Sequence, residues 1–155
     1  MRIVIQRVSS SRVSVEGRTV GEIGAGLCLL IGVAPGDDER TAIWAASKIT
    51  NLRIFEDSEG KMNRSVIDIG GEILAISQFT LYADCKKGRR PSFSGTAKPS
   101  YANVLIESLT ARLREMSISV KTGIFGAEMK VDIENEGPVT IILDSADMPG
   151  NKGSM

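Results

Sequence analysis

The chain has 155 residues, of which 42% are hydrophobic and 25% charged, and its 19 Lys and Arg balance 19 Asp and Glu to a net charge of zero. These proportions are typical of one globular domain, and they exclude a disordered, collagen-like or disulfide-rich chain. With no histidine and only two cysteines, Cys28 and Cys85, the sequence excludes Ser–His–Asp and Cys–His catalysis and gives no support for a zinc site. We therefore expect no metal and no cofactor, and any enzymatic base must be something other than imidazole.

The first half of the chain is predicted to form strands with one helix inserted. Apolar and polar residues alternate around a turn at Glu16-Gly17-Arg18, which is typical of a hairpin. Asp37 and Asp38 suit the amino terminus of a helix, where carboxylates accept unpaired amide protons. In chain order we expect a strand, a hairpin, a buried strand, a helix and a short strand, over residues 2–8, 12–23, 27–33, 38–51 and 52–55.

The second half predicts further strands around a second helix. Pro99 opens this helix, and its apolar residues recur on one face as far as Met116. The stretch Asn135-Glu136-Gly137-Pro138 is predicted to be a turn between strands. In chain order we expect an apolar strand, a long loop, a helix, a short strand, a half-buried strand and a final strand, over residues 73–81, 83–98, 99–116, 118–121, 127–134 and 139–143.

Strands dominate, and clean β-α-β alternation is missing. The predicted fold class is therefore α+β, with a mainly antiparallel, barrel-like sheet and two principal helices. We expect a single domain over residues 1–145 and a flexible tail over 146–155, where Pro, Gly, Asn, Lys and Ser accumulate. The amino terminus lacks signal-peptide architecture, and the longest apolar stretch, Leu27–Ala34, is too short to cross a bilayer. A cytoplasmic location and no membrane partner are expected.

Two segments place chemically useful groups at the ends of strands. Ser77-Gln78-Phe79-Thr80 brings two hydroxyls and an amide to the point where an apolar strand opens into a loop, although Ser and Thr also end strands by bonding their own backbone. Asn135-Glu136-Gly137-Pro138-Val139-Thr140 contains a Gly-Pro step, which is equally typical of an ordinary turn. Neither segment alone predicts a function.

A third segment is basic. Four cations lie in the loop after the first of these motifs, with no carboxylate between Cys85 and Ile106; they are Lys86, Lys87, Arg89 and Arg90. Such a cluster can bind a phosphate backbone even in a neutral protein, although a solvated loop has the same composition.

Taken together, these motifs resemble the D-aminoacyl-tRNA deacylase (D-tyrosyl-tRNA(Tyr) deacylase) family over nearly the whole chain. The matching segments, in chain order, are Ile5-Gln6-Arg7-Val8, Gly21-Glu22-Ile23-Gly24, Arg53-Ile54-Phe55, Gly60-Lys61-Met62-Asn63, Ser77-Gln78-Phe79-Thr80-Leu81, Arg90-Pro91-Ser92-Phe93, Phe125-Gly126-Ala127 and Asn135-Glu136-Gly137-Pro138-Val139-Thr140. Two separated signature motifs in the expected order make a chance match very improbable.

The resemblance implies a homodimeric hydrolase with active sites at the subunit interface. It would cleave the ester of D-aminoacyl-tRNAs such as D-Tyr-tRNA, and of mischarged glycyl-tRNA(Ala), at the 3′-terminal adenosine. It also implies that the Gly137–Pro138 bond is cis and that its two carbonyls enter the neighbouring subunit's pocket, where they hold the substrate's α-ammonium and reject an L side chain. We expect aminoacyl-tRNA as the partner, and no DNA.

Roles for the remaining residues follow from this resemblance and from elementary chemistry. The backbone amides of Phe79 and Thr80 are expected to stabilise the oxyanion, while Ser77 and Gln78 position the ester or the terminal ribose. Thr80 is either a nucleophile, for which no base is evident, or a support for catalysis by the RNA 2′-hydroxyl.

Contacts beyond the ester are assigned in the same way. The cations Lys86, Lys87, Arg89 and Arg90 are expected to contact acceptor-end phosphates. Phe125 and Met129 are candidates for an adenine pocket, with a core role as the alternative.

Two rival functions remain open. One is a non-catalytic RNA-binding module, which would bind tRNA whatever is esterified to it. The other is a threonyl-tRNA synthetase editing module, which would need a partner protein because this chain has no appended catalytic domain. Deacylation of D-Tyr-tRNA, L-Tyr-tRNA and Gly-tRNA by the purified protein distinguishes them.

Overall fold

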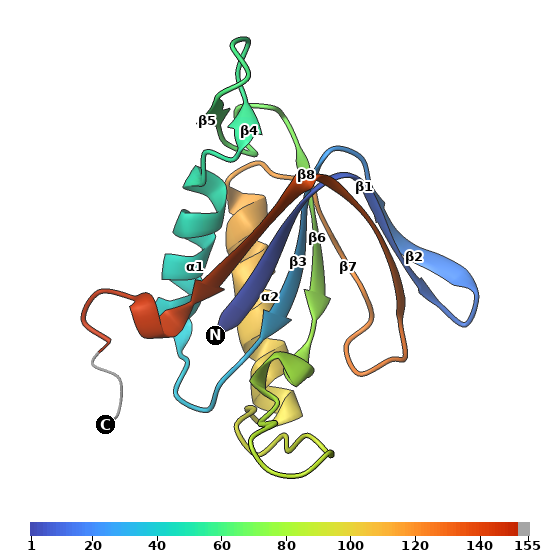
Figure 1. Cartoon of the computed structure of the whole chain (residues 1–155), viewed down its shortest axis with the longest axis vertical. Helices are drawn as coiled ribbons and strands as arrows, with labels where there is room; N and C mark the ends of the chain where they lie inside the picture. The colour runs from blue at the N-terminus through green and yellow to red at the C-terminus, as the bar shows by residue number, and fades with distance from the viewer. Residues whose placement is uncertain (152–155) are drawn as a thin grey trace.

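The computed structural model describes residues 1–151, in which two helices pack on one side of a strongly curved sheet (Figure 1). The sheet has the order β2-β1-β3-β6-β7, and β8 pairs with the other edge of β1. Its strands are β1 (Arg2–Val15), β2 (Arg18–Ile23), β3 (Gly26–Gly32), β6 (Glu72–Ser77), β7 (Val120–Thr122) and β8 (Lys130–Asp144). A separate hairpin is formed by β4 (Phe55–Glu56) and β5 (Met62–Arg64).

Both predicted helices are confirmed to within a residue at each end. Helix α1 (Glu39–Asn51) begins after Asp38, whose side chain accepts from the amide of Thr41 while the Thr41 hydroxyl accepts from the amide of Asp38. Helix α2 (Pro99–Glu115) has proline in its first turn, where no amide proton is needed. The two helices share a core with the facing side chains of the sheet, among them the fully buried Ile5, Leu29 and Leu109.

The sheet is mixed, and this is the one feature of the fold class that the sequence did not show. β1 pairs antiparallel with β2, β3 and β8, whereas β6 runs parallel to both β3 and β7. Each parallel pair is joined by a crossover that contains one of the helices. The predicted α+β class with a mainly antiparallel, barrel-like sheet and two helices is confirmed.

The opposite face of the sheet is covered over only part of its area. There the far ends of β1, β2 and β8 fold over β3 and β6 and enclose a second core, which contains Val8, Val13, Ile23, Cys28, Leu74 and Ile76. Beyond this fold Val4, Leu30 and Ile142 lie on the same face, and Ile142 is 67% exposed. Cys28 is buried, and Cys85 is exposed.

The predicted turn at Asn135–Pro138 is wrong. β8 is one continuous strand that pairs with β1 on both sides of this stretch: Asn135 pairs with Val8, and Thr140 pairs with Gln6. Residues 136–139 therefore leave the ladder opposite Arg7, and we call them the β8 excursion. Its Gly137–Pro138 peptide bond is cis, as the resemblance implied.

Two further strand predictions need correction. Residues 52–54 are not in a strand, which begins only at Phe55. The strand predicted over 73–81 ends at Ser77 and is followed by the 3₁₀-helix η1 (Phe79–Tyr82). The run of apolar residues does not show where β6 ends, because η1 also carries apolar side chains.

The end of the described chain packs against its beginning. The α-ammonium of Met1 contacts the Asp37 carboxylate and the Ser145 hydroxyl, and Ser145 opens the 3₁₀-helix η2 (Ser145–Asp147). Asn151 donates from its side chain to the carbonyl of Ser145 at 2.7 Å. The predicted tail over 146–155 thus begins in defined structure, and its residues 152–155 lie outside the described part.

Two features are absent from residues 1–151. No helix there is long and apolar enough to span a membrane. No group of three or more His, Cys, Asp and Glu is arranged to hold a metal ion in that range.

Candidate functional site

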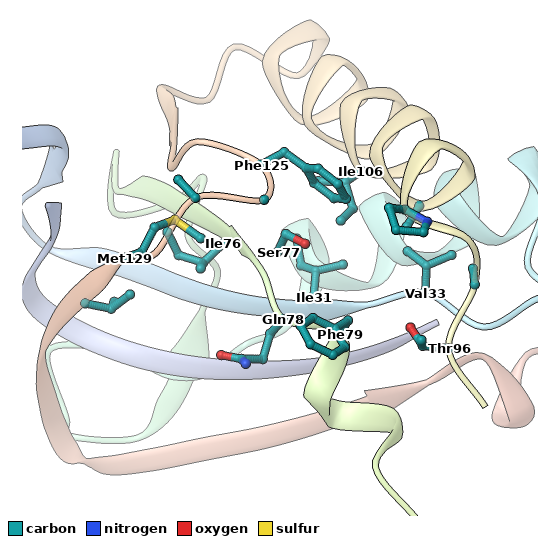
Figure 2. A pocket seen from close by; sticks show the side chains of 16 residues that line it. Ile31, Val33, Ile76, Ser77, Gln78, Phe79, Thr96, Ile106, Phe125 and Met129 are labelled. Carbon is teal, nitrogen blue, oxygen red and sulfur yellow. The ribbon is translucent and has the colours of Figure 1, made fainter. Parts of the chain in front are cut away.

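A largely apolar cavity of about 460 Å³ opens where β6 ends, between η1, α2 and the segment that leads into β8 (Figure 2). This size lies within the range of small-molecule sites. The residues that line it are Ile31, Val33, Ile76, Ser77, Gln78, Phe79, Thr96, Ala97, Pro99, Ala102, Ile106, Phe125, Gly126, Ala127, Met129 and Val131.

The parallel pairing of β3 and β6 delivers the first signature motif to this cavity. Ile31 is in register with Ser77, and the amide of Gln78 donates to the carbonyl of Ile31 at 2.7 Å. The neighbouring Gly32 leaves room for this turn, because a Cβ there would lie 3.1 Å from the Gln78 carbonyl oxygen. The chain then turns at Gln78 and enters η1.

The start of η1 presents two backbone donors. In a 3₁₀-helix the first amides have no partner within the helix, and the first internal bond here runs from Leu81 to the Gln78 carbonyl. Within residues 1–151, the amides of Phe79 and Thr80 donate to no other backbone or side-chain group. Both are therefore available to an oxygen placed beside the start of η1, where Phe79 lines the cavity and Thr80 lies outside its lining.

The side chains of the motif are arranged for positioning rather than for proton transfer. The Gln78 amide donates to the Thr80 hydroxyl oxygen, and an amide is not a base. Tyr82, in the same 3₁₀-helix, has its pKa raised chiefly by burial, so the phenol stays protonated at neutral pH. Arg2 lies 5.0 Å from the centre of the Tyr82 ring and donates to the Leu81 carbonyl, which fixes η1 against β1.

The basic loop is attached directly to this motif. Phe79, 52% exposed, meets Phe93 edge-on with ring centres 5.2 Å apart. Asp84 and Ser92 exchange backbone hydrogen bonds at the neck of the loop. The four predicted cations Lys86, Lys87, Arg89 and Arg90 lie exposed between these two residues.

Figure 2 places Phe125 and Met129 on the wall of the cavity opposite Phe79, so both adenine-pocket candidates line it. A smaller cavity of about 220 Å³ continues past them and adds the polar side chains of Asn103, Glu107 and Thr110. Sequence reasoning missed the contributions of α2, such as Ile106, because an apolar residue on a helix face is indistinguishable from an ordinary core residue.

Gly137 and Pro138 do not reach this cavity. The β8 excursion lies opposite Arg7, which pairs with Leu27, four positions from Ile31 along β3. At 3.3 Å per residue this separation is about 13 Å along the strand. The two signature motifs thus lie at opposite ends of the sheet, and a shallow separate pocket contains Gly137.

A buried arginine holds the β8 excursion. Arg7, only 6% exposed, donates to the carbonyls of Ile54 at 2.8 Å and Glu136 at 3.2 Å. Gly137 has φ +117°, and a Cβ there would lie 2.7 Å from Nη2 of Arg7. The backbone at this point therefore requires glycine.

Comparison with known proteins gives a consistent result. A family model described as D-Tyr-tRNA(Tyr) deacylase matches residues 4–144. A D-aminoacyl-tRNA deacylase of Thermus aquaticus is 53% identical over 98% of this chain and 100% of its own length. The corresponding protein of Thermomicrobium roseum is 54% identical over 97% of each chain.

Solved structures give the same picture of the fold. One named c-Myc DNA Unwinding Element Binding Protein has a TM-score of 0.87 and 40% identity, and covers 94% of this chain and 99% of its own. A second, described as a probable eukaryotic D-amino acid tRNA deacylase, has a TM-score of 0.77 over 92% of this chain and 97% of its own. At 18% identity it supports the fold alone.

Proposed function

The chain belongs to the D-Tyr-tRNA(Tyr) deacylase family, and on that premise we propose that it hydrolyses the ester of D-aminoacyl-tRNAs and of mischarged glycyl-tRNA(Ala), releasing free amino acid and tRNA. The observation that carries the proposal is that the amides of Phe79 and Thr80 have no partner within residues 1–151, and that Phe79 lines an apolar cavity. No step requires the imidazole that the chain lacks.

In this proposal the ester carbonyl lies at the start of η1. The amides of Phe79 and Thr80 donate to the oxyanion and are held in place by the backbone of η1. Ser77 and Gln78 position the ester or the terminal ribose. An aminoacyl ester is already activated by its α-ammonium and its vicinal hydroxyl, so positioning and oxyanion stabilisation suffice.

The ribose 2′-hydroxyl of the substrate then activates the attacking water, and Thr80 supports the geometry. This assignment is favoured because the only side-chain partner of the Thr80 hydroxyl in the described chain is the Gln78 amide, which cannot take its proton.

Chiral selection is assigned to Gly137 and Pro138 acting in a second subunit. Their distance from the cavity of their own subunit supports action in trans. The two carbonyls would hold the substrate's α-ammonium, so that an L side chain collides with rigid backbone while a D side chain points away. Glycine enters as well, since it has no side chain to be rejected.

The exposed face around Val4, Leu30 and Ile142 supports a homodimer. A two-fold contact joins one surface to itself. We propose that its axis runs across the strands, so that the two ends of the sheet are exchanged between the subunits. The β8 excursion of one subunit would then approach the cavity of its partner.

The remaining assignments concern the RNA. The exposed cations at the tip of the basic loop would contact the acceptor-end phosphates, while Phe125 and Met129 would enclose the terminal adenine. We propose the cytoplasm, where charged tRNA is used, as the site of action. We propose RNA rather than DNA as the nucleic-acid partner.

The activity is tested with the purified chain on D-Tyr-tRNA, L-Tyr-tRNA and Gly-tRNA(Ala). We expect kcat/KM to be at least roughly 100-fold higher for the D than for the L ester, a difference of about 2.7 kcal/mol in transition-state binding. Gly-tRNA(Ala) should also be cleaved. Binding without ester loss would instead favour an RNA-binding module, and equal D and L rates would contradict the chiral pocket.

The role of Thr80 is tested by Thr80→Val, which removes only the hydroxyl. A supporting residue predicts a loss of roughly tenfold or less in kcat, whereas a nucleophile predicts abolition of turnover. D-Tyr-tRNA ending in 2′-deoxyadenosine, with the amino acid on the 3′ oxygen, should lose more than about 100-fold if the RNA hydroxyl assists catalysis. Normal cleavage of that substrate would contradict the assignment.

The dimer is tested by Ile142→Asp, which places a charge on the exposed apolar face. Sedimentation should show the wild type as a dimer and the variant as a monomer without deacylase activity, because each cavity lacks its partner's carbonyls. Ile43→Asp is the matched control, since Ile43 is exposed on α1, on the other side of the sheet. A wild type that is monomeric and active would overturn action in trans.

The basic loop is tested by the double variant Lys86→Gln, Arg89→Gln. Loss of two phosphate contacts should weaken binding of uncharged tRNA and reduce the slope of log K against log salt by about one for each contact. Arg40→Gln with Lys48→Gln, on α1, is the control and should leave the slope unchanged. Equal competition by duplex DNA would contradict the preference for RNA.

A further inference from the structure

Hydrogen bonds hold the β8 excursion on two sides, one facing the core and the other facing outward. From within, Arg7 donates to the carbonyl of Glu136, and Val139 is buried in the helix-side core. From outside, the two residues that flank the excursion, Asn135 and Thr140, are the last to pair with β1 before the ladder is interrupted. Their side chains point toward each other across its neck.

These outer side chains form a continuous chain of hydrogen bonds. The Asn135 amide donates to the Thr140 hydroxyl oxygen at 3.5 Å, and the Thr140 hydroxyl donates to the side-chain carbonyl of Gln6 on β1. One hydroxyl thus bridges the two ends of the excursion and ties them to the neighbouring strand. The four residues between them, 136–139, have no ladder partner of their own.

We propose that Gln6, Thr140 and Asn135 form a clamp that fixes the direction of the Gly137–Pro138 carbonyls, and that this clamp sets the discrimination between D- and L-aminoacyl esters. The inference rests on the proposed function. A steric clash rejects the L side chain only if the backbone that it meets cannot move. The backbone of such a site must be held to within about 0.5 Å of its working position. The three side chains are positioning residues, because they act through the excursion and touch no reacting atom.

The clamp can be removed without removing the fold. Thr140→Val keeps the shape of the side chain and the backbone pairing with Gln6, and leaves Arg7 and Val139 in place. An excursion that can rotate admits an L side chain. Its hold on the α-ammonium weakens equally for the D and L esters, because both carry that group, so the ratio of L to D cleavage rises. A purely structural cross-strand pair would lower stability and leave the ratio of L to D cleavage unchanged.

The experiment measures kcat/KM for D-Tyr-tRNA and L-Tyr-tRNA with the full-length dimer. For Thr140→Val we expect the L/D ratio of kcat/KM to rise by at least roughly tenfold, whatever loss of D-Tyr-tRNA cleavage accompanies it. Thr140→Ser, which retains the hydroxyl, should restore the wild-type ratio. If Thr140→Val does not fold, Gln6→Met removes the acceptor from the other strand and should raise the ratio in the same way.

Ser10→Ala is the matched control, because Ser10 makes an equally exposed side-chain bond between the same two strands, to Glu134, outside the excursion. It should leave the ratio unchanged. A wild type without D preference would overturn the proposed function. A wild type that discriminates, with Thr140→Val and Gln6→Met variants that discriminate equally, would overturn the clamp alone.

Discussion

The parallel pairing of β3 with β6 is the contact on which the site depends. The pairing begins where Gly26 lies opposite Glu72. A Cβ at Gly26 would lie only 1.9 Å from the Glu72 carbonyl oxygen, so the two backbones can approach this closely only because residue 26 has no side chain. From there the strands stay in register to Ile31 and Ser77 and end together. Because they end together, the next amide, from Gln78, bonds to Ile31 and turns the chain into η1.

The absence of histidine bears on the chemistry that we propose for this turn. Donors that belong to the backbone are fixed by the fold and do not change protonation with pH, so the proposed oxyanion site would need no titrating group. The cavity wall supplies little polarity of its own: Ile31, Ile76 and Ile106 dominate the part that surrounds the motif.

The sequence predicts the helices and the class of the fold because these depend on local patterns. Capping residues around Asp38, proline at the start of α2 and apolar spacing along both helices are all readable without a structure. The parallel direction of β6 is different, since it depends on which strands β6 pairs with, and local patterns do not show that pairing. The grouping of Ser77–Phe79 with α2 is hidden for the same reason.

The conformation of the second signature motif also depends on strand pairing that the local sequence does not show. Gly and Pro in succession are typical of turns, and the local pattern around Gly137 predicts one. The structure keeps the chain in a single strand, because the pairing of both flanks with β1 outweighs the local preference. The register of β8 and β3 on β1 places Gly137 far from the cavity, and no local pattern in the sequence encodes that register.

The excursion in β8 also lets one strand serve two cores. Before it, Val131 and Ile133 face the smaller core, and after it, the equally odd-numbered Ile141 and Leu143 face the helices on the other side of the sheet. Side chains alternate with a period of two, so the interruption has inverted the strand's inside and outside. Losing a single residue within 136–139 would turn the apolar side chains of one half of the strand out to water, so folding alone constrains the length of this segment, whatever its part in substrate recognition.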